Sequence, residues 1–169
     1  MPTISIIIPH HNGYQILHNC LNSLYKSELH NAEIIIVNNN STDDSISAIN
    51  KEFHHIKLIN SKENLGYAGG CNYGAKYATG EFLVFLNNDT EVDINWLTEL
   101  LKIMNSDNQI SSAQPKILNK KNKTTFDYAG ASGGFIDKYC YPFARGRIFH
   151  TVEEDQGQYN DTIKIFFSS

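Results

Sequence analysis

Four short apolar runs, rich in β-branched residues, recur along the first half of the chain. They cover residues 4–9, 33–37, 56–60 and 82–86. Near-continuous apolar runs of this length are typical of strands that are buried on both faces of a parallel sheet. Each run therefore predicts one buried strand.

Segments with apolar residues at helical spacing separate these runs. Leucines and a cysteine at this spacing predict an amphipathic helix over residues 14–26. Ser41 and Asp43 are predicted to cap the helix that follows the second run, and Asp93 is predicted to cap the helix that follows the fourth run. The glycine-rich segment between the third and fourth runs predicts a helix that ends near Ala78.

Alternation of strands and helices predicts the fold class. A parallel sheet with helices on both faces, that is, a Rossmann-like α/β fold, is expected. The alternation is regular over residues 1–115, and a further strand interrupted by Pro115 is expected over 110–118. Residues 116–169 are rich in glycine and aromatic residues without a clean period, so we expect extended segments and loops within the same compact unit.

The end of the sequence is also unusual. Residues 163–169 form an apolar, strand-like run, with no closing element after it. We expect this run either to pair at a sheet edge or to lead into further structure.

Composition narrows the class of protein. The 169 residues are 41% hydrophobic and 19% charged, as in an ordinary globular domain, and the net charge of −4 argues against a nucleic-acid binder. Three cysteines without a CxxC pair favour a reducing cytosol over a disulfide framework or a zinc site. The first strand begins by Ile4, which leaves no room for a signal peptide, and no apolar run approaches the ~20 residues that span a membrane.

Polar residues collect where the predicted strands end. In an open parallel sheet, ligands bind outside the carboxyl ends of the strands, so we expect a binding site there. The candidate residues are His10, His11, Asn12, Asn38, Asn40, Asn64, Gly66, Asn72, Asn87, Asn88 and Asp89. Asparagine runs are also common in turns, and the glycines of residues 66–74 are also compatible with close helix packing alone.

Two nucleotide-binding motifs can be tested directly. A dinucleotide fingerprint requires G-x-G-x-x-G after the first strand, whereas this chain has G-x-x-G-G-x-x-x-G after the third. The P-loop sequence GK[ST] is absent. An NAD-dependent oxidoreductase is therefore disfavoured.

Four segments in register resemble the glycosyltransferase family 2 enzymes with the GT-A fold, and in particular their rhamnosyltransferase-like branch. The segments are "ISIIIPHHN", "EIIIVNNNSTDDS", "NLGYAGGCNYG" and "FLVFLNNDT". The resemblance is strong to about residue 115 and looser beyond. It implies sugar transfer from a nucleotide-diphosphate donor to a glycan or lipid-linked acceptor in bacterial cell-surface polysaccharide synthesis. Lipid-linked acceptors would place a cytoplasmic enzyme at the inner face of the cell membrane.

The resemblance also implies roles for individual residues. Pro9, His10 and His11 would line the nucleotide pocket, and Asn38 stands where the family usually has an aspartate that binds the nucleoside. Residues 64, 66 and 72 match the loop beside the nucleotide. Residues 1–115 would thus bind the donor, and 116–169 would begin the acceptor side.

"NND" matches the D-x-D position of the family. Asp89 would coordinate Mg²⁺ or Mn²⁺ between the donor phosphates, and Asn88 would bind a ribose or phosphate oxygen. The base of an inverting transferase is expected beyond Ser169. The alternative is a nucleotide-binding fragment that lacks this base and does not catalyse transfer.

Overall fold

The computed structural model describes residues 3–128 and 131–165. The chain divides into two compact units, Met1–Leu97 and Thr98–Ser169, and each has a hydrophobic core of its own. The division falls within helix α4 (Trp96–Met104). The donor and acceptor roles expected for residues 1–115 and 116–169 stay predictions.

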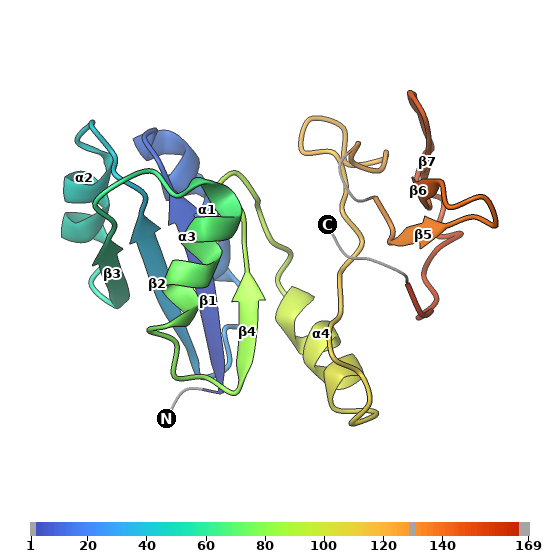
Figure 1. Cartoon of the computed structure of the whole chain (residues 1–169), viewed down its shortest axis with the longest axis horizontal. Coiled ribbons are helices and arrows are strands. Elements are labelled where there is room, and N and C mark those ends of the chain that lie inside the picture. The colour runs from blue at the N-terminus through green and yellow to red at the C-terminus, as the bar shows by residue number, and fades with distance from the viewer. Residues whose placement is uncertain (1–2, 129–130, 166–169) are drawn as a thin grey trace. The chain divides into compact units, whose positions relative to one another are not determined.

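The first unit is built on a four-stranded parallel sheet in the order β3-β2-β1-β4 (Figure 1). The strands are β1 (Ile4–His10), β2 (Ala32–Asn38), β3 (Ile56–Asn60) and β4 (Phe82–Phe85). All four predicted strands are present, with bounds that differ from the apolar runs by at most one residue at either end. β1 is buried along its whole length, and β2 over Ile34–Val37.

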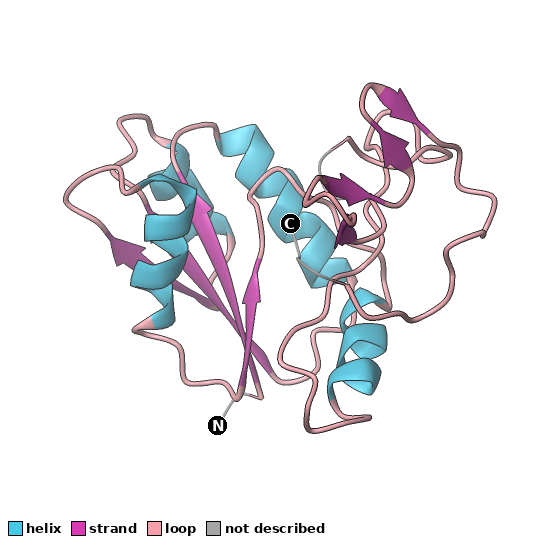
Figure 2. Cartoon of the chain, turned by 45° about the vertical axis from the view of Figure 1, so that its right-hand side comes forward, coloured by secondary structure: helices cyan, strands magenta, loops and turns pink. Residues whose placement is uncertain are grey.

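Helices cover both faces of this sheet (Figures 1 and 2). α1 (Tyr14–Lys26) lies behind the sheet and buries the predicted apolar stripe of Leu17, Cys20, Leu21 and Leu24. α2 (Ser45–Glu52) packs beside α1, where Glu52 accepts hydrogen bonds from Tyr14 and His18. α3 (Gly66–Ala75) crosses the front.

α3 approaches the sheet closely because glycines form its inner face. A Cβ atom added at Gly74 would lie 2.5 Å from Cγ2 of Ile7 and 2.8 Å from Cγ2 of Val37. One added at Gly70 would lie 2.9 Å from Cβ of Pro9. Both distances are shorter than real Cβ contacts, so close packing of α3 on the sheet requires glycine at these two positions.

Three details of the first unit differ from the sequence predictions. β4 is an edge strand whose burial alternates, and Leu83 and Phe85 are 44% and 47% exposed rather than buried. The second helix begins after Asp44 rather than at Ser41, and the Ser41 hydroxyl oxygen accepts from the Asn12 N–H of the loop after β1. Asp43 accepts from the Gly13 N–H of that loop and also from the Ser45 N–H at the start of α2. α3 ends at Ala75, and turns with i→i+3 hydrogen bonds extend to Ala78.

The second unit contains a small antiparallel meander where only loops and extended segments were expected. Its strands are β5 (Gly134–Ile136), β6 (Pro142–Ala144), β7 (Arg147–Ile148) and β8 (Thr151–Val152). The expected strand over 110–118 is wrong, since only an isolated bridge from Leu118 to Phe126 forms there. Pro115 has no backbone N–H to donate to the hydrogen-bond ladder of a sheet, which is consistent with the absence of this strand.

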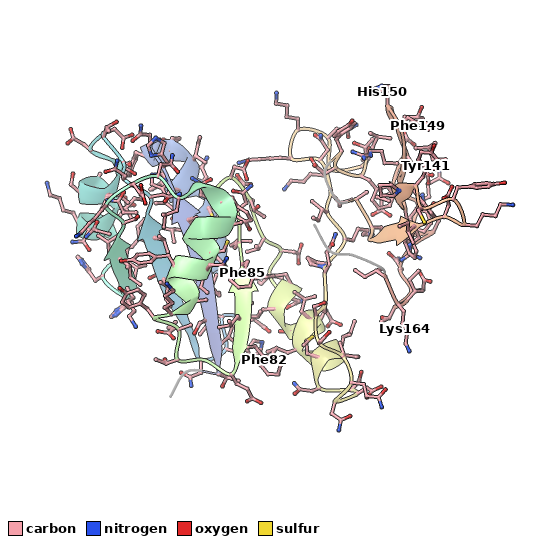
Figure 3. All side chains as sticks on the ribbon, in the orientation of Figure 1. Phe82, Phe85, Tyr141, Phe149, His150 and Lys164 are labelled. Atoms are coloured by element: carbon pink, nitrogen blue, oxygen red, sulfur yellow. The ribbon has the colours of Figure 1, made fainter. Side chains whose placement is uncertain are left out.

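Phe126 forms the centre of the second core, together with Ala131 and Ala144. Gly146, with a φ of 85°, lies directly against its ring. Tyr141 and Phe149 are 70% and 85% exposed and project from the meander (Figure 3). Residues 163–165 are not in a strand, and the rest of the run to Ser169 lies outside the described residues. No helix in the described part of the chain is both long and apolar enough to cross a membrane.

Candidate functional site

The carboxyl ends of the four strands form one polar edge of the first unit. The strand register pairs His10 with Asn38, and Asn38 with Asn60. After β1 the chain continues to β2 and β3 on one side, whereas β4 lies on the other side of β1. The gap between the ends of β1 and β4 is therefore the topological switch point, where open α/β sheets bind their ligands.

The loops after β1 and β2 are bound to each other. The Asn12 Oδ1 atom accepts a hydrogen bond from the Thr42 N–H at 2.8 Å, and the Gly13 N–H donates to Asp43 Oδ2 at 2.7 Å. The pKa of Asp43 is lowered by the Gly13 N–H and by the Ser45 hydroxyl. Asn12, a predicted ligand, thus has its acceptor oxygen occupied within the protein.

The three asparagines after β2 have different roles. Asn38 accepts from the Ser41 N–H at 2.8 Å and donates to Asn60 Oδ1 at 2.9 Å, so both ends of its amide are engaged. Asn39 is buried and binds the backbone of Leu65 and Gly66 at the start of α3. Asn40 is exposed, has a φ of 61°, and makes no side-chain hydrogen bond with any described residue.

The segment that begins α3 presents both structural and open groups. Asn64 Oδ1 accepts from the Gly66 N–H at 2.9 Å, and Gly66 has a φ of 68°, which favours glycine. Asn72 is exposed on α3, and its amide has no partner among the residues described. Of these three predicted ligands, Asn72 keeps the most hydrogen-bonding capacity.

Pro9, His10 and His11 lie at the end of β1. Pro9 is buried beneath Gly70, and His10 is 1% exposed with both ring nitrogens bonded to side chains. His11 is exposed, and its Nδ1 lies 3.0 Å from the Asn39 carbonyl oxygen. Pro9 and His10 therefore support the edge, while His11 is accessible to a ligand.

The loop after β4 carries Asn87, Asn88 and Asp89. Asn87 Oδ1 accepts from the Asn88 N–H at 3.2 Å, and the Asn88 amide nitrogen lies 2.8 Å from Nδ1 of His10. Asp89 is exposed, and no described residue hydrogen-bonds its carboxylate.

Tyr67, on the first turn of α3, was not predicted as a site residue. Burial, a hydrogen bond with Cys71 and the negative charge of Asp89 raise its pKa to about 12. Its phenol therefore stays protonated at neutral pH and can donate a hydrogen bond near Asp89. The only signal for it in the sequence is its position next to Gly66.

The residues at this edge fit a divalent cation in one way only. No group of three or more His, Cys, Asp or Glu side chains occurs within residues 3–128 and 131–165, so a metal site made by protein alone is not seen there. A single open carboxylate, Asp89, suits a hard cation that takes its other oxygen ligands from phosphates and water. A separate cavity of about 470 Å³ is lined by residues of α1 and by Glu91, Val92 and Ile94, and none of the predicted ligands lines it.

Comparison with known proteins identifies relatives of one kind. The profile of the family described as "Glycosyl transferase family 2" matches residues 5–166. A β-1,3-glucosyltransferase of Campylobacter jejuni, named for GalNAc(5)-diNAcBac-PP-undecaprenol, is 32% identical over 62% of this chain and 35% of its own length. The O-antigen biosynthesis protein RfbC of Myxococcus xanthus is 30% identical over 85% of this chain and 11% of its own.

Solved structures agree in fold. A mannosyltransferase of Pyrobaculum calidifontis in complex with GDP-Man and Mn²⁺ matches 69% of this chain and 34% of its own, with a TM-score of 0.57 and 24% identity. A fragment of TarS from S. aureus in complex with UDP matches 71% and 40%, with a TM-score of 0.57 and 23% identity. The predicted α/β fold of the GT-A type is confirmed. The chain spans 35% of the length of the Campylobacter jejuni relative and of an uncharacterised glycosyltransferase of Haemophilus influenzae.

Proposed function

The chain belongs to glycosyl transferase family 2, and from this premise we propose that it transfers a sugar from a nucleoside-diphosphate donor to an acceptor hydroxyl, with the donor bound at the carboxyl edge of the first unit. One observation carries the proposal: the open carboxylate of Asp89 lies at the switch point between β1 and β4. The ligands named for the solved neighbours, GDP-Man and UDP, support a donor of this class.

In the proposed site, Asp89 would hold Mg²⁺ or Mn²⁺ beside the donor diphosphate. When bound, the cation would supply Lewis-acid stabilisation of the negative charge on the departing diphosphate. The Asn72 amide and the protonated Tyr67 phenol supply hydrogen-bond donors for phosphate or sugar oxygens, and the exposed His11 ring supplies a face for the base. The mannosyltransferase neighbour, which contains Mn²⁺, supports the metal.

Transfer with inversion also requires a base that takes the proton of the acceptor hydroxyl. Two acids of the second unit are already paired: Asp155 with Lys116 at 2.5 Å, and Asp161 with Arg145 at 2.9 Å. This pairing favours a second candidate function, nucleotide-sugar binding without transfer by these residues. The relatives named for undecaprenol-linked and O-antigen glycans support cell-surface polysaccharide synthesis with a glycan or lipid-linked acceptor. A lipid-linked acceptor would place the enzyme at the inner face of the membrane.

Calorimetric titration of the chain tests the donor site. We expect one of UDP, dTDP and GDP to bind more tightly in Mn²⁺ than in EDTA, while NAD does not bind. Asp89→Ala should weaken binding in Mn²⁺ at least about tenfold, or about 1.4 kcal/mol, with little change in EDTA. The free energy of unfolding should change little, because Asp89 is exposed at a strand end.

Glu81→Gln is the matched control, because Glu81 is an exposed acid just before the amino end of β4. It should bind like the parent chain. Equal binding of Asp89→Ala and the parent in Mn²⁺ would refute the metal assignment, and failure of every diphosphate to bind would refute the donor site.

A further inference from the structure

His10 joins two parts of the polar edge that are far apart in the sequence. It is the last residue of strand β1 and is 1% exposed. Its Nε2 lies 3.0 Å from the hydroxyl of Ser45, the first residue of α2, and its Nδ1 lies 2.8 Å from the amide nitrogen of Asn88. The imidazole thus bridges the start of α2 and the loop that carries Asp89.

The direction of these hydrogen bonds follows from Asp43, whose carboxylate contacts the Ser45 hydroxyl. Asp43 Oδ1 can only accept, so the Ser45 hydroxyl donates its single hydrogen to it. The Ser45 oxygen must then accept from an Nε2–H of His10, and Nδ1 accepts from the Asn88 amide. Every group is satisfied by one arrangement, in which the imidazole is neutral and its hydrogen is on Nε2.

The surroundings agree with this protonation state. Burial of the ring lowers the pKa of His10, the nearby Asp43 carboxylate raises it, and His11 lowers it further. The balance favours the neutral ring, as the hydrogen-bond directions require. No buried side-chain nitrogen or oxygen of the described residues is without a partner.

We infer that His10 is a positioning residue, which fixes the Asn87–Asp89 loop against the start of α2 and so holds the Asp89 carboxylate in place for the cation. This role rests on the proposed function. It differs from the direct nucleotide contact expected from the sequence, since both ring nitrogens are used within the protein. Partners that orient metal ligands typically affect metal affinity by 10–100-fold.

Two amide variants separate the two halves of the bridge. In His10→Asn, the amide oxygen replaces Nδ1 and can accept from Asn88, but the side chain is too short to reach Ser45. In His10→Gln, the amide nitrogen replaces Nε2 and can donate to Ser45, but no acceptor faces Asn88. Both variants introduce a neutral amide at one buried position, so a general loss of packing affects them alike.

The first readout is the gain in nucleoside-diphosphate affinity in Mn²⁺ relative to EDTA. We expect this gain to be about tenfold smaller in His10→Gln than in the parent chain. In His10→Asn it should differ from the parent value by less than about threefold. An equal loss in both variants indicates a structural role only. No loss in either overturns the proposal.

A second readout needs no nucleotide. In two-bond ¹H–¹⁵N NMR spectra, His10 of the parent chain should be neutral with its hydrogen on Nε2, and the backbone amide signals of residues 87–89 should shift in His10→Gln but not in His10→Asn. Signals that shift in both variants, or in neither, overturn the proposal. If the spectra match these expectations while no diphosphate binds the parent chain, the proposed donor site is refuted, but the positioning of the loop by His10 is not.

Discussion

Polar residues lie at both edges of the first sheet, and their hydrogen bonds distinguish structure from site. At the amino edge, Glu33 Oε1 accepts from the Ser5 hydroxyl at 2.6 Å and from the Thr79 N–H at 2.7 Å, and Ser5 is fully buried. The donors of Ser5 and Thr79 and the Glu33 carboxylate thus satisfy one another's hydrogen-bonding capacity. At the carboxyl edge, Asp89 and Asn72 keep open donors and acceptors. The open capacity, rather than polarity itself, distinguishes the proposed binding edge.

The Glu33 network predicts a specific dependence of stability on pH. Burial alone would raise the pKa of Glu33, but the hydrogen bonds from Ser5 and Thr79 outweigh it, and the pKa is lowered from 4.5. The unfolded chain therefore binds a proton first as the pH falls, so the stability that Glu33 contributes above about pH 4.5 is lost below it. Glu33→Gln should cost about 1–2 kcal/mol of unfolding free energy at pH 7, and less at pH 4.

Urea denaturation at both pH values measures this difference. Glu81→Gln, which removes an exposed acid at the same edge, should show little difference from the parent chain at either pH. A destabilisation by Glu33→Gln that stays constant between pH 7 and pH 4 would show that shape, rather than charge, explains its effect.

At the residue level, the sequence indicated which side chains reach the edge but not which are already engaged. Asn38 and Asn60 are the last residues of different strands, and only the register of β2 on β3 brings their amides together. The same holds for His10 and Asn88, which are 78 positions apart. Such pairs depend on tertiary contacts, which no local pattern encodes.

At the element level, the glycines of α3 have separable roles. A methyl group at Gly74 would lie 2.5 Å from Ile7 in the buried core, whereas one at Gly66 would meet no atom within 4 Å but would be strained at a φ of 68°. Gly74→Ala should therefore cost about 1–3 kcal/mol by overpacking. Gly66→Ala should cost about 1–2 kcal/mol by backbone strain.

A second substitution, at Ile7, distinguishes the two causes. Ile7→Ala removes the Cγ2 methyl group that lies nearest to position 74, so it should relieve part of the cost of Gly74→Ala and none of the cost of Gly66→Ala. A double-mutant cycle, measured by thermal unfolding, reports the interaction directly. Additive effects of Gly74→Ala and Ile7→Ala would contradict the packing explanation.

The elements that the sequence predicted well are those with a strong period. α1 was predicted with its observed bounds, because four apolar residues repeat on one face. The meander was missed because its strands are two or three residues long, too short for an alternating pattern to be visible. Its turn at Gly146 depends on a positive φ and on contact with Phe126, 20 residues away.

At the level of the whole molecule, the candidate site lies within one unit. All of the predicted ligands, from Pro9 to Asp89, belong to Met1–Leu97, and the core of Thr98–Ser169 is separate. The second unit therefore need not be intact for the donor to bind. Trp96, the one tryptophan of the sequence, lies in the first unit and donates its indole N–H to Ser27 at 3.3 Å, so its fluorescence reports on that unit.

Phe126→Ala tests this independence. Phe126 is 1% exposed, so its truncation should destabilise the second unit by about 3–5 kcal/mol. Hydrogen exchange at the Ile117 and Phe126 amides, which bond to Ala131 and Glu153, should accelerate. Trp96 fluorescence should stay unchanged, and nucleoside-diphosphate affinity in Mn²⁺ should change less than about twofold, because no core of the first unit is altered.

Phe149→Ala is the matched control, because this phenylalanine of the same unit is 85% exposed and should affect neither exchange nor affinity. If Phe126→Ala weakens nucleotide binding in proportion to the loss of the second core, residues of Thr98–Ser169 contribute to the donor site. A site confined to the four strand ends would then be refuted, even with the assignment of Asp89 intact. If affinity is preserved, donor binding needs only the parallel sheet and its loops.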